Sequence, residues 1–357
     1  MLPNKLIDKK NLNLIGIKKV KFSHELRRVK KTEDLYKVKE CGVCSSDLKF
    51  IFTGSRIKKF PVILGHELLA VKMAYNSNKK KYVETKKNTV FGAEIPCKKC
   101  KSCLKKNPSN MCDNPLSVGS NLNGGFSNYF IVNKKILKNI PQINFKKRNI
   151  SNICLSESVA CVVNALKLID AKKNNSILII GSGYMGLLFV NIAKIYGLKK
   201  ITVLDLDKNR LSIAKKVGAD NIILVKNKLD NKIRKKLDKI TDRQGFDRVI
   251  SSNSNIESHE FSIYQSAKLG KVNLYGGLPK QDLNKLKIDA NFIHYNQITI
   301  TGSFSSNQDD LNEAFSLISK KKIKFNLMNI KNLSFPNFSE EINNLKNKKY
   351  LKCIFKP

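Results

Sequence analysis

Residues 176–197 read SILIIGSGYMGLLFVNIAKIYG, and the fold of the second half of the chain follows from this segment. Residues 177–180 form a short apolar run typical of a buried strand, and residues 187–197 place apolar side chains at helical spacing. Between the two runs lie Gly181, Gly183 and Gly186. A strand, a tight glycine turn and a helix are therefore predicted in immediate succession.

Strands and helices continue to alternate after this segment. Further strands are predicted at residues 201–204, 222–225, 248–250, 271–275 and 298–301, and a helix at residues 211–217. Strands that alternate with helices of this length imply right-handed crossovers. An α/β fold with a parallel doubly wound sheet is therefore predicted from about residue 159 to residue 302.

The region before residue 150 has a different pattern. Its apolar stretches are short, among them residues 126–132, and they are interrupted by Gly, Pro, Asn and Lys. This pattern predicts a mainly β domain. The segment after residue 303 has a helical stretch near residues 311–319 and is expected to pack back onto an earlier part of the chain.

The glycine turn has the spacing of a dinucleotide-binding motif. Gly181 permits the tight turn, Gly183 admits the pyrophosphate, and Gly186 lets helix and strand pack closely. Asp205 lies nineteen positions after Gly186, at the end of the next predicted strand, where a carboxylate can accept both ribose hydroxyls. Because a carboxylate would repel an additional phosphate, Asp205 predicts NAD rather than NADP as the cofactor.

Two other residues follow in the run LDLDKNRL. Capping a helix is the alternative role for an acidic residue in this run, and Asp207 can fill it. Arg210, on the helix that follows, is a candidate for the adenosine side of the cofactor and equally a candidate surface residue.

Residues 97–113 read CKKCKSCLKKNPSNMCD and contain four closely spaced cysteines, Cys97, Cys100, Cys103 and Cys112. One loop with this spacing can supply four thiolates to a tetrahedral site, which is typical of structural zinc. An iron–sulfur cluster is the alternative. The clustered ferredoxin run, however, has three residues before its last Cys and then Pro, whereas here there are eight, followed by Asp113.

Bulk composition describes an ordinary globular chain. At 357 residues and 41% hydrophobic content, two domains with packed cores are expected. The sequence has no apolar run long enough for a transmembrane helix and no continuous apolar core of signal-peptide length near its start. A cytoplasmic location without a membrane partner is therefore expected, with Cys41, Cys154, Cys161 and Cys353 reduced.

The chain is extremely basic, with a formal charge of +39 from 67 Lys and Arg against 28 Asp and Glu. A nucleic-acid-binding protein is one interpretation, with the cysteine loop as a zinc knuckle. Lysine is spread over nearly every segment, however, which favours a compositional bias on exposed positions over a specific nucleic-acid partner. An anionic small-molecule substrate also remains open.

A second set of metal-binding residue types lies upstream. The run CGVCSSD contains Cys44, Ser46 and Asp47, and the run GHE, with His66 and Glu67, begins twenty-one residues after Cys44. Together with the cysteine quartet and the dinucleotide motif, in this order, the chain resembles the zinc-containing medium-chain dehydrogenases of the alcohol and polyol dehydrogenase superfamily. The resemblance runs from about residue 40 to residue 323.

The resemblance implies a domain organisation. Residues 1–158 would form a GroES-like, mainly β catalytic domain with the structural zinc loop, and residues 159–302 a Rossmann NAD-binding domain. Residues 303–357 would return to the catalytic domain. The closing strand of the family's cofactor domain, at residues 297–302 here, pairs across a two-fold axis, so a homodimer or homotetramer is expected.

The resemblance also implies two zinc ions per chain. Cys44 and His66 match ligands of the catalytic zinc, and Glu157, in LSESVAC, resembles a Glu that supplies a further ligand in polyol and threonine dehydrogenases. Glu67 would lie beside the metal, as a ligand or in contact with one. The Cys97–Cys112 quartet matches the structural zinc loop.

The implied activity is hydride transfer from a secondary alcohol, a polyol or sugar alcohol, to NAD, with zinc as the Lewis acid on the substrate hydroxyl. Ser46 resembles the hydroxyl that begins the proton relay, and Asp47 would orient His66 through its second ring nitrogen. The runs NGGFSNYFIV and IHYNQITITGSFSS favour the sorbitol and threonine branch. Oxidation of an amino alcohol, as in L-threonine 3-dehydrogenases, is the nearest alternative.

The sequence departs from the family pattern at several positions. Lys49 stands where the family commonly has the His that ends the relay, Ala70 replaces a usual Gly, and Ser158 replaces a Pro. A protein that keeps the fold without turnover is therefore a further alternative. None of these departures removes a predicted zinc ligand, and the relay is expected to end directly in water.

Overall fold

The computed structural model describes residues 6–105, 109–146, 150–226, 228–278 and 285–357. The chain divides into two compact units. Unit 1 comprises Met1–Ala160, Ser305–Lys321 and Asn329–Pro357, and unit 2 comprises Cys161–Phe304 and Lys322–Met328. Among the helices in the described ranges, none combines the length and the apolar character that a membrane crossing needs.

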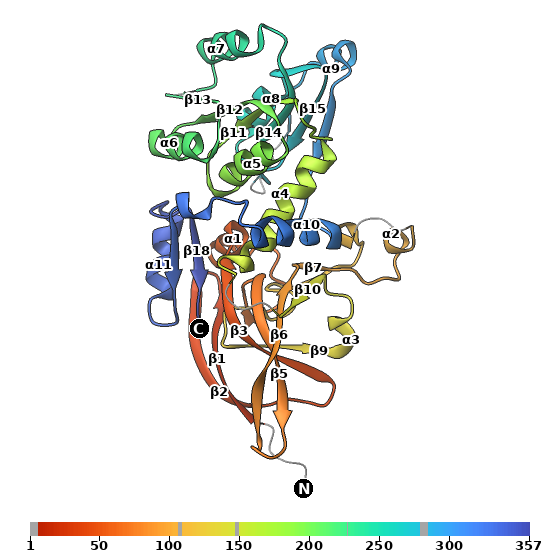
Figure 1. The fold of residues 1–357 in the computed structure, drawn as a ribbon, viewed down its shortest axis with the longest axis vertical. Helices are drawn as coiled ribbons and strands as arrows, with labels where there is room; N and C mark the ends of the chain where they lie inside the picture. Colours follow the sequence, from red (N-terminus) through yellow and green to blue (C-terminus); the bar gives the residue numbers. More distant parts are fainter. Residues whose placement is uncertain (1–5, 106–108, 147–149, 227, 279–284) are drawn as a thin grey trace. The chain divides into compact units, whose positions relative to one another are not determined.

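Unit 2 is built on a six-stranded parallel sheet (Figure 1). In spatial order its strands are β13 (Asn221–Leu224), β12 (Lys199–Asp205), β11 (Ser176–Ile180), β14 (Phe246–Ser251), β15 (Ser266–Leu274) and β16 (Thr299–Gly302). This order confirms the predicted parallel, doubly wound fold. The chain runs outward from β11 in one direction as far as β13 and then returns to its other side with β14, so the strand order reverses at β11.

Both faces of β11 are covered, as its continuous apolar run requires. Leu178 and Ile180 belong to a core cluster that also contains Ile233 of α7 (Asn231–Thr241) and Phe261 of α8 (Ile256–Ile263). Ile177 and Ile179 point to the opposite face by strand alternation, and they are fully buried as well. Burial on both faces is typical of a parallel sheet with helices on each side.

The remaining helices of unit 2 are α5 (Tyr184–Ile195), α6 (Lys208–Val217), α9 (Ala290–Asn296) and the short η3 (Phe325–Leu327). Side chains cap the amino ends of α6, α7, α8 and α9 by accepting backbone N–H bonds, as Asp and Asn prefer to do; the caps are Asp207, Asp230, Asn255 and Asp289. The capping role considered for Asp207 is confirmed.

Unit 1 is mainly β, as predicted. Its seven-stranded sheet runs β10 (Gln142–Phe145), β6 (Lys81–Phe91), β5 (Glu67–Asn76), β3 (Glu33–Val43), β18 (Lys352–Phe355) and β17 (Ile330–Leu333), with β9 (Tyr129–Asn133) also pairing with β3. Smaller sheets join β2 (Lys19–Arg28), β1 (Leu6–Gly16) and β4 (Val62–Ile63), and β7 (Glu94–Ile95) with β8 (Leu116–Ser117).

Short helices connect these strands. They are α1 (Ser45–Thr53), α2 (Lys101–Leu104), η1 (Ser109–Met111), α3 (Lys134–Leu137), η2 (Ile153–Leu155), α10 (Gln308–Ser319) and α11 (Phe338–Lys346). The residues of α4 (Ser156–Leu168) are divided between the two units. The last strand, β18, pairs with β3 near the start of the chain, so the final residues belong to the sheet of unit 1.

The strand predicted at residues 126–132 begins later, at Tyr129. The segment before it runs instead beside Leu64 and Gly65: Phe126 N donates to Leu64 O, and Gly125 N to Gly65 O. Ser127 forms an isolated bridge with Asn11 rather than a rung of the β3 ladder. These bonds to residues 64 and 65 occupy the backbone before Tyr129, so the ladder with β3 starts there.

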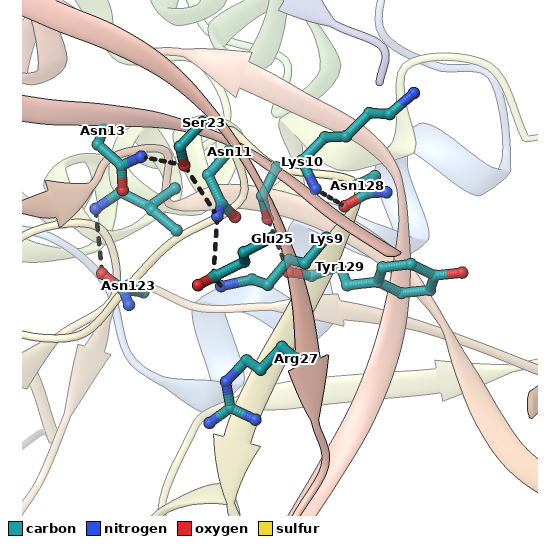
Figure 2. Close-up of polar contacts among 12 residues, drawn as sticks. Lys9, Lys10, Asn11, Asn13, Ser23, Glu25, Arg27, Asn123, Asn128 and Tyr129 are labelled. Carbon is teal, nitrogen blue, oxygen red and sulfur yellow. Dashed lines mark hydrogen bonds and ion pairs between the residues drawn. The ribbon is translucent and has the colours of Figure 1, made fainter. Parts of the chain in front are cut away.

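The N-terminal hairpin of β1 and β2 carries a polar cluster, which Figure 2 shows. Lys9 is only 6% exposed, and its ammonium lies 3.9 Å from Glu25 Oε1. The Nδ2 group of Asn11 donates to Ser23 Oγ and to Glu25 Oε1, at 3.4 and 3.3 Å. Burial lowers the pKa of Lys9, which Glu25 partly opposes. The sequence pattern predicted no individual strand in this region.

Candidate functional site

Strand pairing brings Cys44, His66 and Glu67 together in unit 1. Cys44 follows directly after β3, and Glu67 is the first residue of β5. The two strands are antiparallel, with Gly42 opposite Glu67, so the end of one strand meets the start of the other. The ligand atoms of Cys44, His66 and Glu67 all lie within 4.8 Å of one another.

Asp47 holds this group in place from the first turn of α1. Its carboxylate is fully buried; Oδ2 accepts from Cys44 N at 2.9 Å, and Oδ1 accepts from Gly65 N at 3.3 Å. The same Oδ1 lies 3.5 Å from His66 Nδ1. Burial alone would lower the pKa of His66, but the neighbouring Asp47 carboxylate raises this pKa well above its usual value.

The opposite ring nitrogen of His66 faces the predicted relay residue. Ser46 Oγ lies 3.5 Å from His66 Nε2. With Nδ1 directed at Asp47, Nε2 is the nitrogen left for a metal ion or a substrate. Lys49, three residues further along α1, is exposed to solvent.

A residue that the sequence did not single out contacts Glu67. Lys352 Nζ donates to Glu67 Oε1 at 2.5 Å, and both side chains are almost completely buried. β18 pairs with β3 on the side opposite to β5, and this pairing positions Lys352. No local signal marks it, because 285 residues separate the two partners.

The second oxygen of Glu67 indicates that the group can bind a metal. Glu67 Oε2 is buried and has no hydrogen-bond partner among the described residues. It occupies space that only a glycine leaves open, since a Cβ added at Gly42 would lie 1.9 Å from it. A thiol, an imidazole and an unpartnered carboxylate oxygen form a donor set that suits zinc. Glu157, at the start of α4, is 4% exposed and lies outside this three-residue group.

The four cysteines of the loop also converge. Their sulfur atoms lie within 4.8 Å of one another, and Cys100 Sγ is 3.8 Å from Cys112 Sγ. Pairing of β7 with β8 brings the two ends of the loop together. Backbone amides point at the sulfurs: the N–H of Lys99 lowers the pKa of the Cys97 thiol to about 6, and Cys97 N donates to Cys112 Sγ at 3.3 Å.

The glycine turn of unit 2 has the three properties that its motif predicts. Gly181 has a φ of +102°, which a side chain rarely adopts. Space is open around Gly183, with no atom within 4 Å of an added Cβ. A Cβ at Gly186 would lie 1.9 Å from Gly181 O, so only glycine permits this approach of helix to strand. The turn can therefore accept a phosphate group against its backbone.

Asp205 lies beside this turn, at the end of β12. Its Oδ2 accepts from Ser182 N at 2.5 Å, and its Oδ1 accepts from Asp207 N at 2.9 Å. Arg210 is directed toward the cap of its own helix, with Nε 3.6 Å from Asp207 Oδ2. Asp205 is thus joined to the glycine turn, whereas Arg210 is held within α6.

Two protein families match the chain. The family described as an alcohol dehydrogenase GroES-like domain matches residues 30–142, and the family described as a zinc-binding dehydrogenase matches residues 185–320. The first range falls in the mainly β part of unit 1, and the second covers most of unit 2 and ends in the Ser305–Lys321 segment of unit 1.

Several proteins similar to this chain are named as polyol dehydrogenases. The chain is 27% identical over 296 residues to a D-arabitol-phosphate dehydrogenase of Enterococcus avium, covering 82% of this chain and 81% of the relative. It is 28% identical over 277 residues to a sorbitol dehydrogenase of Bacillus subtilis, covering 76% and 75%.

A solved structure shows the same fold. A zinc-binding dehydrogenase from Sinorhizobium meliloti, bound to NADP, matches 98% of this chain and 100% of its own with a TM-score of 0.83, at 22% identity. The matched families, the two units and the converging ligand groups agree. The chain is a zinc-binding medium-chain dehydrogenase, with a GroES-like domain and a Rossmann-type domain, whose relatives include sorbitol and other polyol dehydrogenases.

Proposed function

We propose that this protein oxidises a secondary alcohol, a polyol or sugar alcohol, and transfers the hydride to NAD. The observation that carries the proposal is the group of Cys44, His66 and Glu67, in which one buried carboxylate oxygen lacks a hydrogen-bond partner among the described residues. A buried carboxylate oxygen without a hydrogen-bond partner is costly, so we take a bound metal ion to be its partner. We further propose residues 1–158 as the catalytic domain, residues 159–302 as the NAD domain and residues 303–357 as a return to the first.

In this proposal Cys44, His66 and Glu67 hold the catalytic zinc, and Glu157 approaches as a further ligand from the start of α4. Zinc bound there would act as a Lewis acid on the substrate hydroxyl, and the nicotinamide would take the hydride. Asp47 keeps His66 oriented by its contact with Nδ1. Ser46, beside Nε2, would accept the proton of the substrate hydroxyl while its own hydroxyl proton passes to water in the exposed neighbourhood of Lys49.

The substrate class is supported by the relatives and compatible with the charge. Both curated relatives named above are polyol dehydrogenases, and one acts on a phosphorylated polyol by name. The formal charge of +39 is compatible with an anionic substrate. Phosphorylated polyols therefore belong among the first substrates to test.

A substrate panel tests the proposed function. Zinc-loaded protein should form NADH with at least one polyol or phosphorylated polyol, and poorly with L-threonine. If phosphate contributes to binding, kcat/KM for the phosphorylated member should fall as salt is added, because added salt screens exposed charges. Turnover of threonine alone, or no turnover across the panel, would contradict the proposal.

We propose NAD as the cofactor because of Asp205. Replacing Asp205 with Asn removes the charge but keeps an acceptor for Ser182 N. We expect the ratio of kcat/KM for NAD over NADP to fall by about tenfold or more, corresponding to ~1.4 kcal/mol. Asp207→Asn is the matched control, since Asn caps α6 equally well. An unchanged ratio in Asp205→Asn would contradict this role.

We propose that Cys97, Cys100, Cys103 and Cys112 bind a structural zinc. Cys103→Ser is expected to lower the zinc content by about one ion per chain and to lower the melting temperature, while the catalytic ion stays bound. Metal analysis with a thermal melt measures both. Iron in place of zinc, with a brown chromophore, would indicate an iron–sulfur cluster instead.

We propose a homodimer or homotetramer. β16 is an edge strand of the six-stranded sheet, so its outer backbone groups can pair with a second copy. Sedimentation should therefore give two or four times the chain mass; a monomer would contradict it. A cytoplasmic location is proposed because none of the nine cysteines forms a disulfide, which suits a reducing compartment.

A further inference from the structure

His259 lies where the cofactor crevice of unit 2 is expected. In open α/β sheets, ligands bind beyond the carboxyl ends of the strands, where the strand order reverses. Here that point lies between the ends of β11 and β14. His259 is on α8, immediately after β14, and is 3% exposed.

Both ring nitrogens of His259 bind strand-end loops. Nε2 lies 2.8 Å from Gly276 O, just after β15, and Nδ1 lies 2.7 Å from Ser251 Oγ, at the end of β14. Because a carbonyl oxygen only accepts, Nε2 must donate, and the neutral ring then accepts the Ser251 hydroxyl proton at Nδ1. Burial lowers the pKa of His259, which favours this neutral form.

One of the loops that His259 joins, the segment after β14, lies against the glycine turn. Ser252 N donates to Ile180 O at 2.9 Å, and Ser252 Oγ lies 3.4 Å from Gly181 O. A Cβ added at Gly186 would contact Ser252 Oγ at 3.2 Å. The segment that follows Ser251 is therefore a wall of the glycine turn.

The loop after β15 is packed equally closely. A Cβ added at Gly276 would lie 1.8 Å from Asn253 O, so these two loops touch through their backbones. The amide groups of Tyr275 and Gly276 both donate to Ser251 O, at 3.1 Å each. His259 adds the only side-chain connection between Ser251 and Gly276 that the described residues show.

We propose that His259 is a positioning residue for the dinucleotide cofactor, fixing the ends of β14 and β15 as one wall of the crevice. This inference rests on the proposed use of a nicotinamide cofactor by the glycine turn. His259 does not touch the reacting atoms. It acts through Ser251 and Gly276, so its loss should weaken cofactor binding more than it slows the chemical step.

Three variants and one control test this. His259→Phe keeps a ring but removes both bonds, His259→Gln supplies an amide donor and an acceptor, and Ser251→Ala removes one bond. The control is His294→Gln, at an exposed position on α9. The affinity of each zinc-loaded protein for NADH is measured by calorimetry, alongside its melting temperature. KM for NAD and kcat are measured with any alcohol that the wild type oxidises.

For His259→Phe we expect the Kd for NADH and the KM for NAD to rise about tenfold or more, with kcat at saturating NAD within about twofold. His259→Gln should restore the Kd to within about threefold of wild type, and Ser251→Ala should lie between them. His294→Gln should be unchanged. If His259 had a purely structural role, the melting temperature would fall without a rise in KM for NAD at nearly constant kcat.

Other outcomes would overturn the inference. One is a folded His259→Phe variant that binds NADH with wild-type affinity. The other is a His259→Gln variant that binds NADH as weakly as the His259→Phe variant does. If His259→Phe does not fold, an unchanged affinity in Ser251→Ala overturns it. A wild type that binds neither NADH nor NADPH would instead contradict the proposed function, so the two failures can be told apart.

Discussion

Replacing Cys44 with Ser is expected to lower kcat/KM by at least about a thousandfold, because a metal ion contributes several kcal/mol to transition-state stabilisation. Cys44 supplies the thiol of the Cys44, His66 and Glu67 group. A serine hydroxyl is a poor substitute for a thiolate at zinc, so the catalytic ion should be lost. Activity and zinc content, measured on the same preparation, check this result.

The zinc content should fall by about one ion per chain, because the cysteine loop keeps its own ligands. Cys161→Ser is the control, since Cys161 lies outside both ligand groups. It should retain full activity and both ions. Undiminished activity in Cys44→Ser would remove Cys44 from the proposed catalytic site.

Replacing Lys352 with Met is expected to lower the free energy of unfolding by about 3–5 kcal/mol, because it leaves the Glu67 carboxylate buried without its partner. The pair is short, at 2.5 Å, and its two side chains are 4% and 0% exposed. Released from Lys352, the carboxylate also loses its fixed orientation, so kcat should fall as well. Urea unfolding of the zinc-loaded protein measures the first effect.

The double variant Glu67→Gln with Lys352→Met separates charge from packing. Removing both charges should recover most of the lost stability, since neutral replacement of a buried pair is often close to neutral in free energy. Activity should stay low, because Glu67 is missing. Lys331→Met is the control: its partner is Glu341 at 3.8 Å, and its side chain is 44% exposed.

Lys331 is largely exposed, and the buried Glu341 carboxylate keeps a hydrogen bond from Asn344 Nδ2 at 3.0 Å. A pair with one exposed, solvent-screened partner contributes about 0–1 kcal/mol, so Lys331→Met should change stability little. Equal stability of the Lys331→Met and Lys352→Met variants would show that the Lys352 pair is not needed to balance Glu67.

The parallel sheet of unit 2 was predictable because its signals are local. Each strand is an apolar run next to a turn, and β11, the glycine turn and α5 follow one another within one short segment. The close approach of Gly186 to Gly181 also joins residues only a few positions apart. Contacts between residues that lie so near in sequence leave a motif that can be recognised in the sequence itself.

The N-terminal part of unit 1 was not predictable in the same way. β1 carries buried polar residues, Lys9 and Asn11, at positions where alternation would lead one to expect apolar side chains. Asn11 can be buried because its Nδ2 group donates to side chains of β2. The alternation of apolar and polar residues that normally marks a strand is therefore missing from the sequence of β1. The ladder starting at Tyr129 was likewise set by contacts with a distant segment.

Spacing alone therefore indicated an alternating α/β half, a glycine turn beside Asp205 and a loop of four cysteines, because each of these depends on neighbours in sequence. Lys352 and His259 became visible only in the folded chain. Lys352 meets Glu67 because β18 and β5 flank β3, and His259 joins two loops because β14 and β15 end side by side. Such contacts bring together segments that sheet pairing makes adjacent, and neither segment carries a local pattern that records its partner.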